Sequence, residues 1–111
     1  MRVEKSWGYE DLIHNGAYCT KLLVYTKRIA SSLHYHEKKH EIFIVHSGKF
    51  DIDTFQPGAT GAASRLYFPG DYLVLPPLTR HRIRCLEPGT IIETSTHDDP
   101  EDCVRLVPSE V

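Results

Sequence analysis

Apolar and polar positions alternate along most of this chain, in short runs separated by turn-forming residues. The clearest case is the segment 49–55, in which Phe50 and Ile52 alternate with Lys49 and Asp51. A period of two residues is typical of a β-strand with one buried and one solvated face. The pattern therefore predicts a half-exposed strand in this segment.

Similar apolar runs, bounded by turn signals, predict strands along the rest of the chain. In segment 41–46, for example, Glu41, Phe43 and Val45 share one face of the expected strand. No stretch of eleven or more residues combines helical periodicity with capping residues, and many short strands indicate an all-β sandwich or barrel. The expected strands cover residues 18–29, 31–36, 41–46, 49–55, 64–68, 70–75, 80–86, 90–96 and 103–107.

Three segments lie outside this strand pattern. Residues 56–63 are small and turn-prone, which predicts a mobile hairpin loop. Residues 1–12 carry Trp7 and Tyr9 on either side of a glycine, and we expect an extended arm or edge strand that needs a surface to pack on. Residues 98–111 form a tail that begins with acidic, turn-like sequence.

Length and charge restrict the class of protein. The 111 residues suffice for a single domain with a modest core, so residues 1–111 are taken as one unit. Because 13 basic and 15 acidic residues give a net charge of -2, no nucleic-acid partner is expected. No stretch approaches the ~18 apolar residues of a membrane span, and no signal-peptide pattern opens the chain. Three widely spaced cysteines favour free thiols in a reducing compartment. We therefore expect a cytoplasmic protein.

The segment 32–48 carries the strongest chemical signal. On a strand His34 and His36 point to the same side, and a short turn would bring Glu41 beside them on the next strand. Two imidazoles and a carboxylate suit a borderline divalent metal ion such as Zn, Mn, Fe, Ni or Co. The alternative is a histidine-rich surface hairpin, which the neighbouring lysines and His40 would also fit.

A second segment, residues 70–81, offers a fourth ligand. Gly70 and Asp71 form a turn into an apolar run, and Pro76-Pro77 closes that run before a strand that begins around His81. Alone, this histidine would be an ordinary strand residue. Combined with the first segment, it completes a predicted metal site formed by His34, His36, Glu41 and His81.

The two segments together resemble the two motifs of the cupin superfamily. The first matches as His34-x-His36-x4-Glu41-x6-Gly48, and the second as Gly70-x5-Pro76 followed by His81. The resemblance implies a small cupin barrel, which is a double-stranded β-helix or jelly roll, with one divalent metal ion. The sequence departs from the family pattern at Leu78 (usually glycine), Cys85 (commonly asparagine) and Arg28 (often glycine).

Further stretches are similar to the cupin domain of type II mannose-6-phosphate isomerases and related sugar-phosphate cupins. These are Trp7-Gly8-Tyr9-Glu10, with Ser6 in place of proline, the run 91–97, and the acidic tail 98–102 followed by Arg105. The resemblance implies an isomerase or epimerase-like enzyme whose metal orients and polarises a sugar phosphate. Alternatives are a mononuclear non-haem iron dioxygenase or lyase-type cupin, and a non-catalytic metal-dependent sugar-binding module.

Strand parity sorts the remaining charged residues. Arg80, Arg82 and Arg84 alternate with His81, so they should point out of the barrel and form a solvated or subunit-facing stripe instead of a phosphate clamp.

Lys21, Arg65 and Glu93 are candidate pocket residues, and Lys21 and Glu93 are the candidate catalytic residues. Lys21 is either a cation lining the barrel or an edge lysine that guards against aggregation. His40 should face away from Glu41.

The expected partners are a small polar substrate, with a sugar phosphate preferred, and a second copy of the chain. Leaving Trp7 and Tyr9 in water would forfeit roughly 1.5–3 kcal/mol each. We therefore expect a homodimer in which the N-terminal arm docks on the partner's sheet. The competing arrangement has the arm folded back over its own barrel.

Overall fold

The computed structural model describes residues 1–111 and consists of eleven β-strands without a helix. The predicted all-β fold class is therefore confirmed. No helix of the length and apolarity needed to cross a membrane is present. The strands are β1 (Arg2–Lys5), β2 (Gly8–Asn15), β3 (Tyr18–Tyr25), β4 (Leu33–Tyr35), β5 (Glu41–Val45), β6 (Lys49–Phe55), β7 (Ala63–Tyr67), β8 (Tyr72–Leu75), β9 (Arg80–Glu87), β10 (Gly89–Thr96) and β11 (Val104–Val107).

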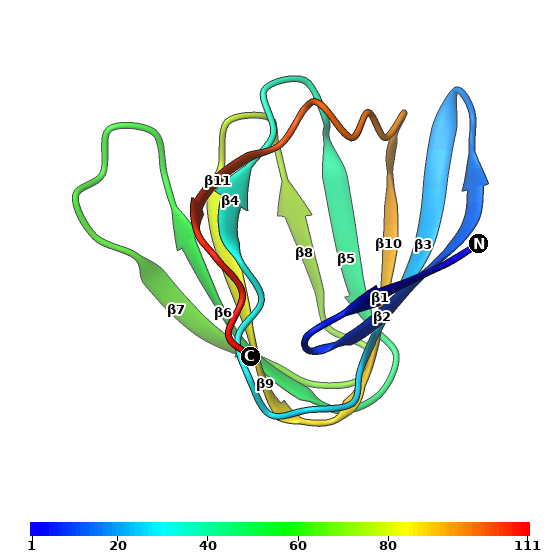
Figure 1. The fold of residues 1–111 in the computed structure, drawn as a ribbon. Helices are drawn as coiled ribbons and strands as arrows, with labels where there is room; N and C mark the ends of the chain where they lie inside the picture. The colour runs from blue at the N-terminus through cyan, green and yellow to red at the C-terminus, as the bar shows by residue number, and fades with distance from the viewer.

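The strands form two antiparallel sheets that face each other as a barrel with an open upper end (Figure 1). One sheet has the order β1-β2-β3-β10-β5-β8, and the other has the order β11-β4-β9-β6-β7. Strands distant in sequence are neighbours in both sheets, as in the pairs β3–β10 and β4–β9. This connectivity is that of a jelly roll, in which strands alternate between two packed sheets.

The predicted alternation of buried and solvated side chains is confirmed in the central strands. In β6, Phe50 and Ile52 are buried whereas Lys49 and Asp51 are partly exposed. The inward rows of both sheets meet in one core between them. Its buried members are Trp7, Leu23, Tyr25, Phe43, Val45, Phe50, Ile52, Tyr67, Leu75, Ile83, Cys85 and Ile91.

Strand β9 follows the same rule and places its arginines as predicted. His81 and Ile83 are buried, and the three arginines that alternate with them are partly exposed on the opposite face. Arg82 donates a hydrogen bond from Nε to the carbonyl of Ser31 at 3.0 Å, and Arg84 lies 3.7 Å from an Asp51 oxygen. The arginine stripe therefore does not reach the barrel interior.

The N-terminal arm folds back on its own barrel. Strands β1 and β2 form a hairpin, and Trp7 in its turn is only 4% exposed and stacks on Tyr25, with the ring centroids 4.2 Å apart. The next residue, Gly8, lies close against the backbone of β3, since its φ is +150° and a Cβ there would lie 1.9 Å from the Val24 oxygen. The expectation that Trp7 docks on a second subunit is therefore wrong. The homodimer itself stays a prediction.

The C-terminal segment closes the barrel on the side of the predicted metal site. After β10, residues 97–103 cross the open upper end and continue into β11 (Figure 1). Strand β11 pairs with β4, with Arg105 opposite His34, which confirms the predicted final strand. Residues far apart in the sequence are thereby brought to one end of the barrel.

One strained residue lies next to this end. Leu78 has a φ of +69°, in the left-handed region that disfavours side chains with a Cβ. This is the position at which the cupin pattern usually has glycine. The backbone N–H of Leu78 donates a hydrogen bond to the carbonyl of His36 at 2.7 Å, so the strained turn is tied to the first segment of the site.

Candidate metal centre and its charged cavity

Strand pairing explains why the four predicted ligands converge. His34 lies in β4 directly opposite His81 in β9, and His36 follows β4 by one residue. Glu41 is the first residue of β5, so the turn after His36 returns its carboxylate toward the histidines. The local spacing predicted this turn, and the β4–β9 pairing supplies the distant histidine.

The donor atoms form two overlapping groups. His36 Nε2 lies 3.5 Å from one Glu41 oxygen, and His81 Nε2 lies 3.6 Å from the other. The ligand atoms of these three residues are all within 4.8 Å of one another. His34 stacks edge-on against His81, with the ring centroids 4.5 Å apart, but its ligand atom groups with those of His36 and Cys103. The structure thus brings the four residues together, and their joint coordination of one ion stays a prediction.

Backbone carbonyls orient all three imidazoles. Nδ1 of His81 lies 2.9 Å from the Thr79 carbonyl oxygen, and Nδ1 of His34 lies 3.2 Å from that of Ser32. Nδ1 of His36 bonds to the carbonyl of Asp102. A carbonyl oxygen only accepts hydrogen bonds, so Nδ1 of His36 and Nδ1 of His81 carry the proton, and a neutral ring then keeps a free lone pair on Nε2. At His34 the Ser32 hydroxyl also lies 3.0 Å from Nδ1 and can donate or accept there. Metal-binding histidines are typically held in this way.

Two observations fit a divalent cation at this point. His81 Nε2 is buried without a hydrogen-bond partner, and it faces a carboxylate oxygen that cannot donate to it. An unsatisfied buried acceptor costs about 1–3 kcal/mol, which a bound cation would offset. Burial lowers the pKa of His34 to about 2 and also lowers the pKa of His81, so both rings are neutral at physiological pH, as metal coordination requires.

A buried lysine connects the metal cluster to further carboxylates. Lys39 is 3% exposed, and its Nζ lies 3.1 Å from Glu41 Oε1, 2.7 Å from Glu93 Oε2 and 2.8 Å from Asp98 Oδ1. Burial alone would lower the pKa of Lys39, but the surrounding carboxylates raise it above its ordinary value. Lys39 therefore remains a cation and fixes the distance between a predicted metal ligand and Glu93.

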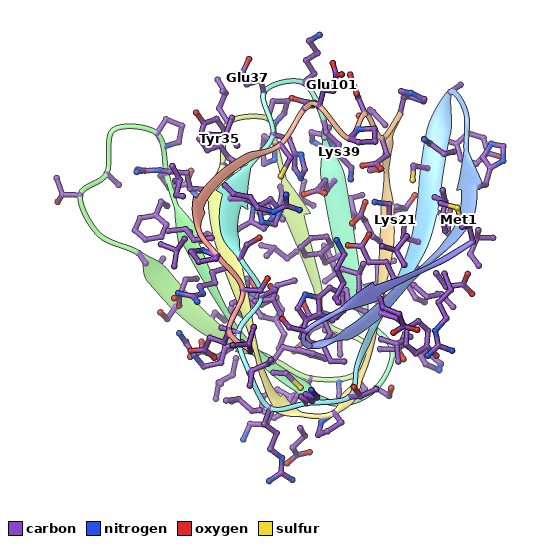
Figure 2. The ribbon with its side chains drawn as sticks, in the orientation of Figure 1. Met1, Lys21, Tyr35, Glu37, Lys39 and Glu101 are labelled. Atoms are coloured by element: carbon purple, nitrogen blue, oxygen red, sulfur yellow. The ribbon has the colours of Figure 1, made fainter.

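Lys21 occupies the next position in the same network. Its Nζ lies 3.0 Å from Asp98 Oδ2 and 3.4 Å from Glu10 Oε1. Strand β3 is internal to its sheet, so Lys21 is a barrel-lining cation and not an edge lysine. Figure 2 shows Lys21 and Lys39 between the two sheets, whereas Glu37 lies at the upper rim.

These groups line one cavity of about 320 Å³ between the sheets. Both candidate catalytic residues, Lys21 and Glu93, lie on its wall, and their catalytic role stays a prediction. Lys5 and Arg105 add further positive charge to the lining. Arg65 is not part of it, because it is exposed on the edge strand β7 and covers the Tyr67 ring, so its prediction as a pocket residue is wrong.

Sequence reasoning missed two residues that organise the site. Lys39 lies in the turn before Glu41, and its sequence context gave it no role beyond that turn. It precedes Glu41 by two residues and, like Glu41, is buried, which parity could have indicated. Asp102 was assigned to an acidic tail. Its carboxylate accepts hydrogen bonds from the backbone N–H groups of Glu37, at 2.8 Å, and of Lys39, at 3.1 Å. No local pattern could reveal a contact between segments 65 residues apart.

Comparison with known proteins identifies the fold. No family model and no curated protein matches the sequence. Among solved structures, the capsular polysaccharide assembling protein CapF from Staphylococcus aureus superposes with a TM-score of 0.85 at 18% identity, covering 96% of this chain and 31% of CapF. KdgF from a Halomonas species gives 0.78 at 18% identity, with 91% of both chains covered.

Oxalate decarboxylase from Bacillus subtilis gives a TM-score of 0.79 at 18% identity, covering 95% of this chain and 29% of the enzyme. The chain thus spans less than a third of the length of CapF and of oxalate decarboxylase, but most of KdgF. At such identities the likeness shows the fold alone, and the predicted cupin jelly roll is confirmed.

Proposed function

We propose that this cupin-fold chain is a metal-dependent enzyme of the sugar-phosphate isomerase or epimerase type. A divalent metal ion, one of Zn, Mn, Fe, Ni or Co, would be held by His34, His36, Glu41 and His81. The observation that carries the proposal is the meeting, around one cavity, of His34, His36 and Glu41 with a buried lysine–carboxylate network. The unsatisfied lone pair of His81 faces Glu41 from behind the cavity wall.

The reaction class follows from the groups that the cavity offers. An aldose–ketose isomerase removes a proton from the carbon next to the carbonyl and returns it to the neighbouring carbon. This transfer needs a base, and it needs a group that stabilises the negative charge developing on the carbonyl oxygen. When bound, the metal ion supplies that stabilisation as a Lewis acid. Glu93 is the base in this proposal, since it lines the cavity and burial, followed by the Glu41 charge, raises its pKa and thereby its proton affinity.

Lys39 and Lys21 have different parts in this scheme. Lys39 contacts both Glu41 and Glu93, so it sets the spacing between the metal ligand and the base. Lys21 contacts neither of these carboxylates and instead holds Asp98, which in turn accepts a bond from Lys39. Of the two candidate catalytic residues, Glu93 thus moves the proton and Lys21 positions the network.

The substrate should be small, polar and anionic. A cavity of about 320 Å³ with charged walls suits a short polyhydroxylated molecule better than a long apolar chain. Lys5 and Arg105 belong to the lining and would meet the phosphate. A fatty acid or a terpene would leave these charges desolvated and unpaired, at considerable cost.

The test is a panel of aldose and ketose phosphates scored for both binding and conversion by the metal-loaded protein. In deuterium oxide, conversion through Glu93 should place deuterium on the carbon next to the carbonyl, detected by nuclear magnetic resonance. Glu93→Gln should abolish conversion while keeping metal content. Binding without conversion by the unmodified protein would identify the non-catalytic sugar-binding module, and preference for apolar ligands would refute both sugar-directed functions.

The need for oxygen as a co-substrate distinguishes the dioxygenase alternative from the proposed isomerase. After anaerobic loading with Fe(II), a dioxygenase would consume oxygen when a substrate is added. The isomerase proposed here would convert its substrate equally with and without oxygen. Oxygen uptake coupled to substrate loss would therefore replace the proposal with the oxidative alternative.

A further inference from the structure

Cys103 lies beside the two histidines contributed by β4. The residue before it, Asp102, accepts the hydrogen bond from His36 Nδ1, so one short segment both orients an imidazole and places a thiol next to it. The ligand atoms of His34, His36 and Cys103 all lie within 4.8 Å of one another. Donors on opposite sides of one zinc ion are about 4.3 Å apart, from a Zn–N bond of about 2.0 Å and a Zn–S bond of about 2.3 Å. The thiol is therefore within reach of an ion held by these histidines.

An unsatisfied lone pair lies in the adjacent donor group, formed by His36, Glu41 and His81. His81, which is 1% exposed, directs an unpartnered Nε2 toward Glu41 and stacks against His34. The two donor groups share His36, and Cys103 would reach an ion near His36 from the side of His34. Cys103 therefore lies next to a donor group that contains an unsatisfied imidazole lone pair.

We propose that Cys103 is a further protein ligand of the metal ion and binds as a thiolate. A sulfur–metal bond forms and the thiol proton leaves to solvent, without any oxidation or reduction. This inference rests on the metal site of the proposed function, and it adds a ligand that the motif spacing does not contain.

A sulfur ligand would change both metal preference and substrate access. Thiolate is a soft donor, so it selects zinc, cobalt, nickel or iron over manganese. With three imidazoles, one carboxylate and one thiolate, a six-coordinate ion keeps one open position instead of two. The substrate would then reach the metal through one oxygen atom, unless Cys103 dissociates as the substrate binds.

Cobalt(II) provides a direct test, because thiolate bound to cobalt gives an intense charge-transfer band in the near ultraviolet. The metal-free full-length protein would be titrated anaerobically with cobalt(II), with bound cobalt measured separately by elemental analysis. We expect one cobalt per chain and a charge-transfer band that is lost completely in Cys103→Ser. Cys85→Ala is the matched control, because this buried core thiol lies outside both donor groups, and it should keep the band.

The outcomes separate this inference from the proposed function. One bound cobalt without the charge-transfer band would overturn the role of Cys103 and leave the metal site standing. No bound cobalt in any protein would overturn both.

Alkylation gives a second readout that needs no variant. Cys103 is partly exposed whereas Cys19 and Cys85 are buried, so in the folded protein Cys103 should react first. Zinc should slow that reaction at least tenfold, and an unchanged rate would overturn the inference.

Discussion

Replacing Lys39 with methionine should destabilise the metal-free protein by about 3–5 kcal/mol, the usual effect of removing one partner from a buried ion network. Methionine preserves the length of the side chain but removes the ammonium that lies within 3.1 Å of Glu41, Glu93 and Asp98. Three carboxylates would then share a largely dehydrated space with Lys21 as the remaining nearby cation. The loss is electrostatic, because the packing volume hardly changes.

Urea unfolding at pH 7, monitored by circular dichroism, measures this effect. Lys38→Met is the matched control, since Lys38 is exposed in the same turn and should change stability by less than about 0.5 kcal/mol. Adding Glu93→Gln to Lys39→Met removes one of the uncompensated charges and should restore part of the lost stability. If Lys39→Met were as stable as Lys38→Met, Lys39 would not be the cation that holds the network together.

Three further predictions concern the metal site. His36→Ala should abolish stoichiometric metal binding while the barrel stays folded, and unchanged metal content by elemental analysis would contradict the ligand assignment. Asp102→Asn should weaken metal affinity about tenfold or more by loosening the turn that carries His36, measured by competition with a chelating dye; equal affinity would exclude this supporting role. Metal-free protein should lose stability as pH falls below the ordinary histidine value of 6.5, because His34 and His81 bind fewer protons folded than unfolded. The slope is about 1 kcal/mol per pH unit for each histidine, and equal urea midpoints at pH 7 and 5.5 would refute it.

The strand pattern and the metal motif could be predicted because both are local. A period of two residues determines which side chains of β6 are buried, and it needs no knowledge of the partner strands. The spacing of His34, His36 and Glu41 likewise lies within one hairpin. Only His81 required combining two segments, and its pairing with β4 places it where the combination predicted.

The missed features depend on contacts between distant segments. Lys39 is buried because Glu93 on β10 and Asp98 beyond it surround the turn, and 59 residues separate Lys39 from Asp98. A lysine in a turn is normally solvated, so local sequence gives the opposite expectation. Trp7 posed a related problem: its size indicates burial, but sequence alone does not say whether the covering surface belongs to the same chain.

The charges around the cavity connect the metal to the choice of substrate. Glu41, Glu93 and Asp98 face two ammonium groups, those of Lys39 and Lys21, which leaves one net negative charge. The rest of the lining adds two carboxylates, Glu10 and Asp99, and two cations, Lys5 and Arg105, so the net charge of the cavity stays at minus one.

A phosphate entering the metal-free cavity would therefore meet a net negative wall. One divalent ion reverses the sign of that wall, since the histidines that hold it are neutral and add no charge of their own. Within the proposed function, the metal therefore does more than polarise a carbonyl, because it makes the cavity electrostatically accessible to an anion. On this proposal we expect the metal to bind before the sugar phosphate, while Lys39 and Lys21 offset the mutual repulsion of the buried carboxylates.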